Sequence, residues 1–246
     1  MEALCFNITR CALQAAMDMR SKLILITLLG APGSGKGTQC KLLSRALGIP
    51  GISSGDMLRS HVQRRTELGL LASKAMQRGE LVQDEIVCGM LSSRIVEADC
   101  AEGFVLDGIP RTLHQAEFLE LQLKRLQAGA RIVRIVVSLE LERGAALRRL
   151  GGRRICPECS ASYNVELRPP RLENRCDNDG AELLTREDDR EEICGSRFDA
   201  YAESGLTLKR YYRSRYRVHE MNGARPAKEI QEEILGIVAG FCRVAG

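Results

Sequence analysis

Residues 30–38, Gly-Ala-Pro-Gly-Ser-Gly-Lys-Gly-Thr, combine the residue types that phosphate binding requires. The four glycines allow backbone conformations that a Cβ atom forbids, so successive N–H groups can turn inward around phosphate oxygens. Lys36 can place its charge on the outer phosphates, and the hydroxyl of Thr38 can hold Mg²⁺. The usual phosphate loop has this hydroxyl directly after the lysine, whereas here Gly37 intervenes. The alternative is a glycine-rich turn without a ligand, but the lysine and the threonine favour nucleotide binding.

A second group of residues has the spacing of a metal site. Cys156 and Cys159 form a Cys-x-x-Cys pair, and Cys176 and Asp179 repeat the same spacing. Two such turns offer four ligands in tetrahedral geometry, and Zn²⁺ accepts both thiolate and carboxylate. Three alternatives are a three-cysteine site completed by water, a segment without metal whose thiols are free, and ligation by the neighbouring Asp177.

Strands and helices must position both groups. Residues 22–29 form a continuous apolar run, which predicts a strand buried on both faces, as in a parallel sheet. The apolar spacing of residues 39–47 predicts a helix whose N-terminus points at the same phosphates as the loop. Further strands are predicted at 103–107 and 131–139, the second rich in β-branched residues.

The remaining periodic segments complete an alternation of strands and helices. Residues 49–54 and 218–221 are expected as short strands, and residues 153–186 as an irregular segment. Helices are expected at 56–78 (two helices broken near Gly69), 83–98, 113–126, 140–150, 189–216 (with Gly205 a candidate break) and 226–244. This alternation predicts an α/β fold with a mostly parallel sheet and ligands at the carboxyl ends of its strands.

Asp107 follows a predicted strand, where phosphate-loop enzymes place a carboxylate near Mg²⁺. By itself it is equally well explained as an aspartate that caps a turn. Because residues 30–38 and 107–111 both follow strands, we expect them to share one site.

Composition limits the other classes of function. The net charge is only +4, which does not favour a nucleic-acid partner, and no apolar run approaches the length of a membrane span. The chain has ten cysteines, but Cys40 and Cys88 fall within predicted helices, so a general disulfide framework is not expected. We therefore expect neither nucleic acid nor membrane as a partner.

The loop with its additional Gly37 resembles that of the adenylate kinase family. The resemblance continues, in the family's order, through residues 52–59, 79–82, 106–112, 152–154 and 186–197. It implies a phosphate-loop parallel sheet flanked by helices, divided into a core (22–52, 83–151 and 190–246), a helical insertion for the nucleoside monophosphate (53–82) and a lid (152–189). It also implies a cytoplasmic, monomeric enzyme that converts ATP and AMP into two ADP with Mg²⁺. Residues 1–21 resemble nothing in the family and are expected to be an extension.

For catalysis, the resemblance implies that the transferred phosphate is surrounded by Lys36, Arg111, Arg153, Arg186 and Arg197. Phosphoryl transfer needs such positive groups because negative charge spreads over the equatorial oxygens. Thr38 and Asp107 are assigned to Mg²⁺. ATP is assigned to Gly33, Ser34, Gly35, Lys36, Gly37, Thr38, Arg149, Arg153, Ser162, Tyr163 and Arg225.

For the acceptor, the resemblance assigns AMP to Ser54, Arg59, Glu80, Leu81, Val82, Gly108, Ile109, Pro110, Arg111, Gln115, Arg186 and Arg197. Gln115 is expected to recognise the adenine edge, and Arg111 to bind the AMP phosphate. Ile109 replaces the phenylalanine that is usual in the family, and Arg225 stands where relatives often have lysine.

The resemblance also supports a structural zinc ion held by Cys156, Cys159, Cys176 and Asp179, because many bacterial adenylate kinases have such a lid. Two related functions stay open, another nucleoside monophosphate kinase and a GTP:AMP phosphotransferase. The long lid argues against the pyrimidine kinases. A function of a different class, a regulatory zinc protein that binds nucleic acid and uses the loop for control, lacks a basic or aromatic binding surface.

Overall fold

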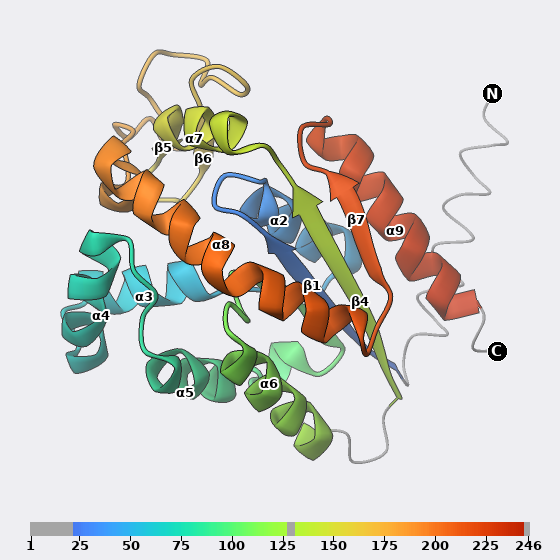
Figure 1. The fold of residues 1–246 in the computed structure, drawn as a ribbon. Coiled ribbons are helices and arrows are strands. Elements are labelled where there is room, and N and C mark those ends of the chain that lie inside the picture. The colour runs from blue at the N-terminus through green and yellow to red at the C-terminus, as the bar shows by residue number, and fades with distance from the viewer. Residues whose placement is uncertain (1–21, 127–130, 244–246) are drawn as a thin grey trace, which may run out of the picture.

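The computed structural model describes residues 22–126 and 131–243, so the predicted extension 1–21 lies outside the described residues. The centre of the protein is a five-stranded parallel sheet in the order β2-β3-β1-β4-β7 (Figure 1). The strands are β1 (Lys22–Gly30), β2 (Gly51–Ser53), β3 (Gly103–Asp107), β4 (Arg131–Glu140) and β7 (Val218–Asn222). The predicted α/β fold with a parallel sheet is confirmed.

The apolar run of β1 is continuous because both faces of the strand are covered. Ile24, Ile26 and Leu28 pack with α2 (Lys36–Leu47) and α9 (Ala227–Arg243). Leu23 and Leu25 point to the opposite face, because successive side chains of a strand alternate. That face is covered by α5 (Asp84–Arg94) and α6 (Leu113–Leu126), and the long α8 (Glu191–Arg213) crosses beside them (Figure 1).

The helical insertion after β2 consists of α3 (Ser54–Gln63) and α4 (Glu67–Arg78). The two predicted helices are confirmed, but they separate at residues 64–66 and not at Gly69, which lies inside α4. Thr66 caps α4 by accepting a hydrogen bond from the Gly69 N–H at 3.1 Å. Gly69 instead allows close packing of the two helices, since a Cβ atom there would lie 2.2 Å from the carbonyl oxygen of His61.

Two further helices differ from the prediction. α8 (Glu191–Arg213) runs without interruption through Gly205 for 23 residues, so Gly205 is not a break. A Cβ atom at Gly205 would lie 3.1 Å from the Tyr201 ring, so this glycine leaves room for an aromatic side chain. α7 (Arg143–Gly151) begins later than predicted, because β4 continues to Glu140 and Glu142 precedes the first turn.

Residues 152–189 form a second excursion from the sheet, which we call the lid. It contains the antiparallel pair β5 (Arg153–Ile155) and β6 (Ser162–Asn164), and it ends in a short 3-10 helix, η3 (Glu187–Asp189). Its small interior consists of Cys156, Tyr163, Cys176 and Leu183. Another 3-10 helix, η2 (Ala98–Cys100), precedes β3. Within the described ranges, no helix is both long and apolar enough to cross a membrane.

Candidate functional site

The loop between β1 and α2 encloses the ammonium group of Lys36. Its Nζ donates hydrogen bonds to the carbonyl oxygens of Gly30 at 2.6 Å and Ala31 at 2.8 Å. Burial lowers the pKa of Lys36 to about 8, although the Asp107 carboxylate opposes this effect. Gly33 is required where the loop approaches α7, because it has a φ of 82° and a Cβ atom would lie 2.6 Å from the Ala146 carbonyl oxygen.

The additional glycine of the loop faces the end of β3. A Cβ atom at Gly37 would lie 3.2 Å from Oδ2 of Asp107, so the first turn of α2 and this carboxylate are neighbours. Thr38 is exposed in the same turn. The structure therefore brings the loop, Lys36 and the first turn of α2, which contains Thr38, to the carboxylate at the end of β3.

A cavity lies beyond Asp107, between the helical insertion and the core. Gly108 accepts hydrogen bonds from Ser54 Oγ at 2.6 Å and Arg111 Nε at 2.8 Å. Its φ is 70°, and a Cβ atom would lie 2.9 Å from Arg111 Nη2, so only glycine fits this turn. Burial and the nearby charge of Arg197 lower the pKa of Arg111.

Most of the residues predicted for the acceptor line this cavity, and three do not. Its lining includes Ser54, Arg59, Glu80, Leu81, Val82, Gly108, Arg111, Gln115 and Arg197. Ile109, joined to Pro110 by a cis peptide bond, is buried in the core, and Arg186 lies outside the lining. The cavity is also lined by residues that were not predicted from the sequence: Gly55, Leu58, Met76, Gly79, Val87, Asp188 and Ala200. Gly55 and Gly79 are adjacent to predicted site residues, but nothing in the local sequence singles out Leu58, Met76 or Ala200.

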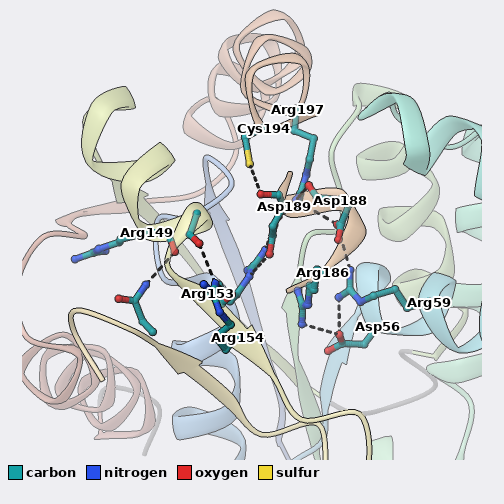
Figure 2. Close-up of polar contacts among 12 residues, drawn as sticks. Asp56, Arg59, Arg149, Arg153, Arg154, Arg186, Asp188, Asp189, Cys194 and Arg197 are labelled. Atoms are coloured by element: carbon teal, nitrogen blue, oxygen red, sulfur yellow. Dashed lines mark hydrogen bonds and ion pairs between the residues drawn. The ribbon is translucent and has the colours of Figure 1, made fainter. Parts of the chain in front are cut away.

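Four of the predicted arginines converge on the carboxylates of Asp56, Asp188 and Asp189 (Figure 2): Arg153 and Arg186 of the lid, Arg59 of the insertion and Arg197 of α8. Arg153 and Arg197 both bind the carboxylate of Asp189, with Arg153 Nε at 2.6 Å and Arg197 Nη1 at 2.8 Å. Arg197 also pairs with Asp188 at 3.2 Å. These two aspartates were not predicted as site residues, although they lie only two and three residues after Arg186 in the chain.

Arg59 and Arg186 connect the insertion to the lid. Arg59 pairs with Asp56 at 2.6 Å and with Asp188 at 3.6 Å, and Arg186 lies 3.7 Å from Asp56 (Figure 2). Burial, together with the charges of Arg59 and Arg153, lowers the pKa of Arg186 to about 10. Its Nε is buried and has no hydrogen-bond partner among the residues that the structure describes. This arrangement leaves a donor that an anion can accept from.

Other residues predicted for the donor nucleotide lie around the lid and α9. Arg149 Nη1 donates to the Gly223 carbonyl oxygen at 2.8 Å, and Arg225 pairs with Glu233 of α9 at 2.6 Å. Ser162 and Tyr163 lie in β6. The Tyr163 ring is buried inside the lid, where its hydroxyl accepts a hydrogen bond from the Asp177 N–H at 2.8 Å.

The four predicted metal ligands come together in the lid. The ligand atoms of Cys156, Cys159, Cys176 and Asp179 all lie within 4.8 Å of one another. The sulfur atoms of Cys159 and Cys176 are 3.4 Å apart, and Cys156 Sγ is 3.3 Å from Asp179 Oδ2. Sulfurs bound tetrahedrally to one zinc ion lie about 3.8 Å apart, so this set fits zinc. Hydrogen bonds from the Cys159 thiol and the Ala181 N–H lower the pKa of Asp179 to about 2.

The sheet, the phosphate-type loop and the converging arginines define a phosphoryl-transfer enzyme of the P-loop class. A family model described as adenylate kinase matches residues 28–217. An adenylate kinase of Syntrophotalea carbinolica is 44% identical over 208 residues, which cover 85% of this chain and 95% of the relative. An adenylate kinase of Archaeoglobus fulgidus is 42% identical over 213 residues, 87% and 97% of the two chains. The chain belongs to the adenylate kinase family, as its sequence motifs predicted.

Proposed function

We propose that this protein catalyses the reversible transfer of a phosphoryl group from ATP to AMP, which yields two ADP. The observation that carries the proposal is the junction of two anion sites at Asp107. The Lys36 ammonium of the loop and the Arg111 guanidinium of the cavity both interact electrostatically with that carboxylate. A donor phosphate on the loop and an acceptor phosphate in the cavity would meet there.

On the donor side, the loop residues 33–38 would hold the ATP phosphates through backbone N–H groups and Lys36. Mg²⁺ bound with ATP would neutralise phosphate charge, and Thr38 and Asp107 are the residues that would hold it. Arg149, Ser162, Tyr163 and Arg225 are proposed to border the donor base and ribose. Because the Tyr163 ring is buried in the lid, its contribution would come from the main chain.

On the acceptor side, Arg59 and Arg111 would bind the AMP phosphate, and Ser54, Leu81, Val82 and Gln115 would surround the base. In this structure, the guanidinium groups of four arginines form ion pairs with nearby carboxylates. The arginines are Arg59, Arg153, Arg186 and Arg197, and the carboxylates are those of Asp56, Asp188 and Asp189. Phosphate oxygens can replace the carboxylates in these contacts when the nucleotides bind. The arginines would then stabilise the charge of the transferring phosphoryl group.

The lid would exclude water, which otherwise competes with AMP for the phosphoryl group. A structural zinc ion on Cys156, Cys159, Cys176 and Asp179 would stiffen it, since its small apolar interior is a weak core by itself. Residues 152–189 would thus move as one body relative to the core, with residues 53–82 as the acceptor-binding insertion. We further infer a cytoplasmic monomer without nucleic-acid or membrane partners.

The test is a scan of acceptors with Mg-ATP in a coupled assay for ADP. We expect kcat/KM for AMP to exceed that for CMP, UMP and dTMP by at least about a hundredfold, because buried polar groups reject a base that leaves them unpaired. Lys36→Met is the control that attributes the turnover to this protein. If kcat/KM for UMP is comparable to that for AMP, the protein is a pyrimidine nucleoside monophosphate kinase and the proposal is wrong. Retention on nucleic acid without any turnover would favour the regulatory zinc protein instead, and GTP in place of ATP tests the GTP:AMP alternative.

A further inference from the structure

The side-chain amide of Gln115 is held at both ends. Its Oε1 accepts a hydrogen bond from the backbone N–H of Arg111 at 2.8 Å. Its Nε2 donates to Oδ1 of Asp84, in the first turn of α5, at 2.7 Å. Gln115 is only 2% exposed and lines the acceptor cavity, whereas Asp84 is absent from that lining. Asp84 therefore reaches the cavity only through Gln115.

These two contacts fix the orientation of the amide, that is, which side carries the carbonyl oxygen Oε1 and which side carries the NH₂ group Nε2. A backbone N–H can only donate and an ionised carboxylate can only accept, so a flipped amide would face donor with donor and acceptor with acceptor. The contact with Arg111 uses one lone pair of Oε1, and the contact with Asp84 uses one N–H of Nε2. One N–H and one lone pair of the carbonyl oxygen are left for a ligand, in an order that the protein has fixed.

We propose that Asp84 is a positioning residue that sets the purine specificity of the acceptor site by orienting the Gln115 amide. This inference rests on the proposed function. The edge of adenine offers a ring nitrogen acceptor beside an amino donor, whereas hypoxanthine offers the reverse, a ring N–H beside a carbonyl oxygen. A freely rotating amide would pair with either base. An amide with a fixed orientation pairs with adenine and opposes hypoxanthine in the same pose, which leaves buried polar groups unpaired.

Asp84 also joins two helices, so a purely structural role has to be separated from this one. Its Oδ2 accepts a hydrogen bond from Thr112 Oγ1 at 2.7 Å, at the start of α6, and lies 3.4 Å from His114 Nδ1. Thr112 in turn accepts from the Gln115 N–H at 3.1 Å and so caps α6. A structural role predicts lower stability with unchanged base selectivity, whereas the positioning role predicts a change in selectivity that requires Gln115.

The experiment measures kcat/KM for AMP and for inosine monophosphate, with Mg-ATP as donor, in Asp84→Leu and Asp84→Asn. We expect Asp84→Leu to lower the AMP preference about tenfold, mainly through KM, with KM for ATP unchanged. Asp84→Asn should stay within about threefold of the parent, because its carbonyl oxygen can still accept from Gln115. Glu85→Leu is the matched control, since it removes an exposed carboxylate from the same helix turn without touching Gln115.

A double-mutant cycle completes the test. In a Gln115→Ala background, Asp84→Leu should change the base preference less than twofold, because the group through which Asp84 acts is gone. An unchanged preference in folded Asp84→Leu, or an equal loss with and without Gln115, would overturn the proposal. If Asp84→Leu does not fold, Asp84→Ser gives the same comparison with a smaller polar side chain. A parent protein that does not phosphorylate AMP would refute the proposed function itself, which is a distinguishable outcome.

Discussion

Asp189, the last residue of the lid, is a buried carboxylate that connects the lid to α8. Its side chain has no exposed surface, and it binds both Arg153 of β5 and Arg197 of α8. Its carbonyl oxygen also accepts a hydrogen bond from the Cys194 thiol at 3.3 Å. Asp189→Asn removes the negative charge and one acceptor but keeps the shape. The Arg153 and Arg197 side chains, 22% and 14% exposed, would then lack their shared counterion.

The expected cost follows from this burial. Removing one partner of a buried ion pair typically costs about 3–5 kcal/mol, because the other charge stays desolvated. Asparagine keeps one carbonyl acceptor, so we expect the lower end, about 3 kcal/mol of unfolding free energy. For a chain of this size, about 2–4 °C of melting temperature correspond to each kcal/mol, so Tm should fall by roughly 6–12 °C. Misplacement of Arg153 and Arg197 should also lower kcat.

The assay is thermal unfolding followed by circular dichroism, with urea unfolding as a second measurement of the same free energy. Asp199→Asn is the matched control, because the Arg143–Asp199 pair at 2.9 Å is more than half exposed on both sides. Exposed pairs contribute about 0–1 kcal/mol, so its Tm should change by no more than about 4 °C. Equal Tm changes in the two variants would refute the argument that burial makes the Asp189 network costly to break.

Three further predictions concern the loop and the lid. Lys36→Met should lower turnover with AMP and Mg-ATP by about two to four powers of ten in a folded protein, and near-normal turnover would exclude the role assigned to Lys36. Because the pKa of Lys36 is lowered to about 8, the ammonium loses its proton as the pH rises through that value. We therefore expect kcat/KM for Mg-ATP to fall about tenfold per pH unit above roughly pH 8. Lys36→Arg should abolish this alkaline decrease, because arginine stays protonated. A decrease that persists in Lys36→Arg would belong to another titrating group. Cys159→Ser should reduce zinc content, measured by mass spectrometry without chelator, and lower Tm while turnover persists well below melting. Asp179→Cys should retain the metal, and a parent protein with far less than one zinc per chain would contradict both expectations.

Several parts of the structure follow from short stretches of sequence. Three features are local patterns in the sequence: the apolar run at residues 22–29, the glycine loop at 30–38, and the two ligand pairs of the lid, Cys156/Cys159 and Cys176/Asp179. Their geometry is made by consecutive residues, so the sequence is enough to predict a buried strand, an anion-binding turn and a four-ligand cluster. The order of strands and helices predicted the parallel sheet for the same reason.

The two glycines that were predicted to interrupt helices show where local reasoning fails. Gly69 and Gly205 both lie inside helices, because each glycine serves a packing contact. One allows α4 to approach the end of α3, and the other leaves space for the Tyr201 ring. A helix tolerates the modest propensity cost of glycine when a tertiary packing contact offsets it. The local sequence does not show which residue will pack against the glycine.

The sequence by itself determined which residue types can bind phosphate, which cysteines can share a metal ion and, by resemblance, which arginines belong to the site. Only the tertiary structure decided how they are paired. Asp189 meets Arg153 across 36 residues of chain, and Asp84 meets Gln115 across 31. The physical reason is that a carboxylate can pair with any cation or donor that the fold brings to it. Such pairings depend on how the lid, the insertion and the core pack against one another, and no spacing in the sequence encodes those distances.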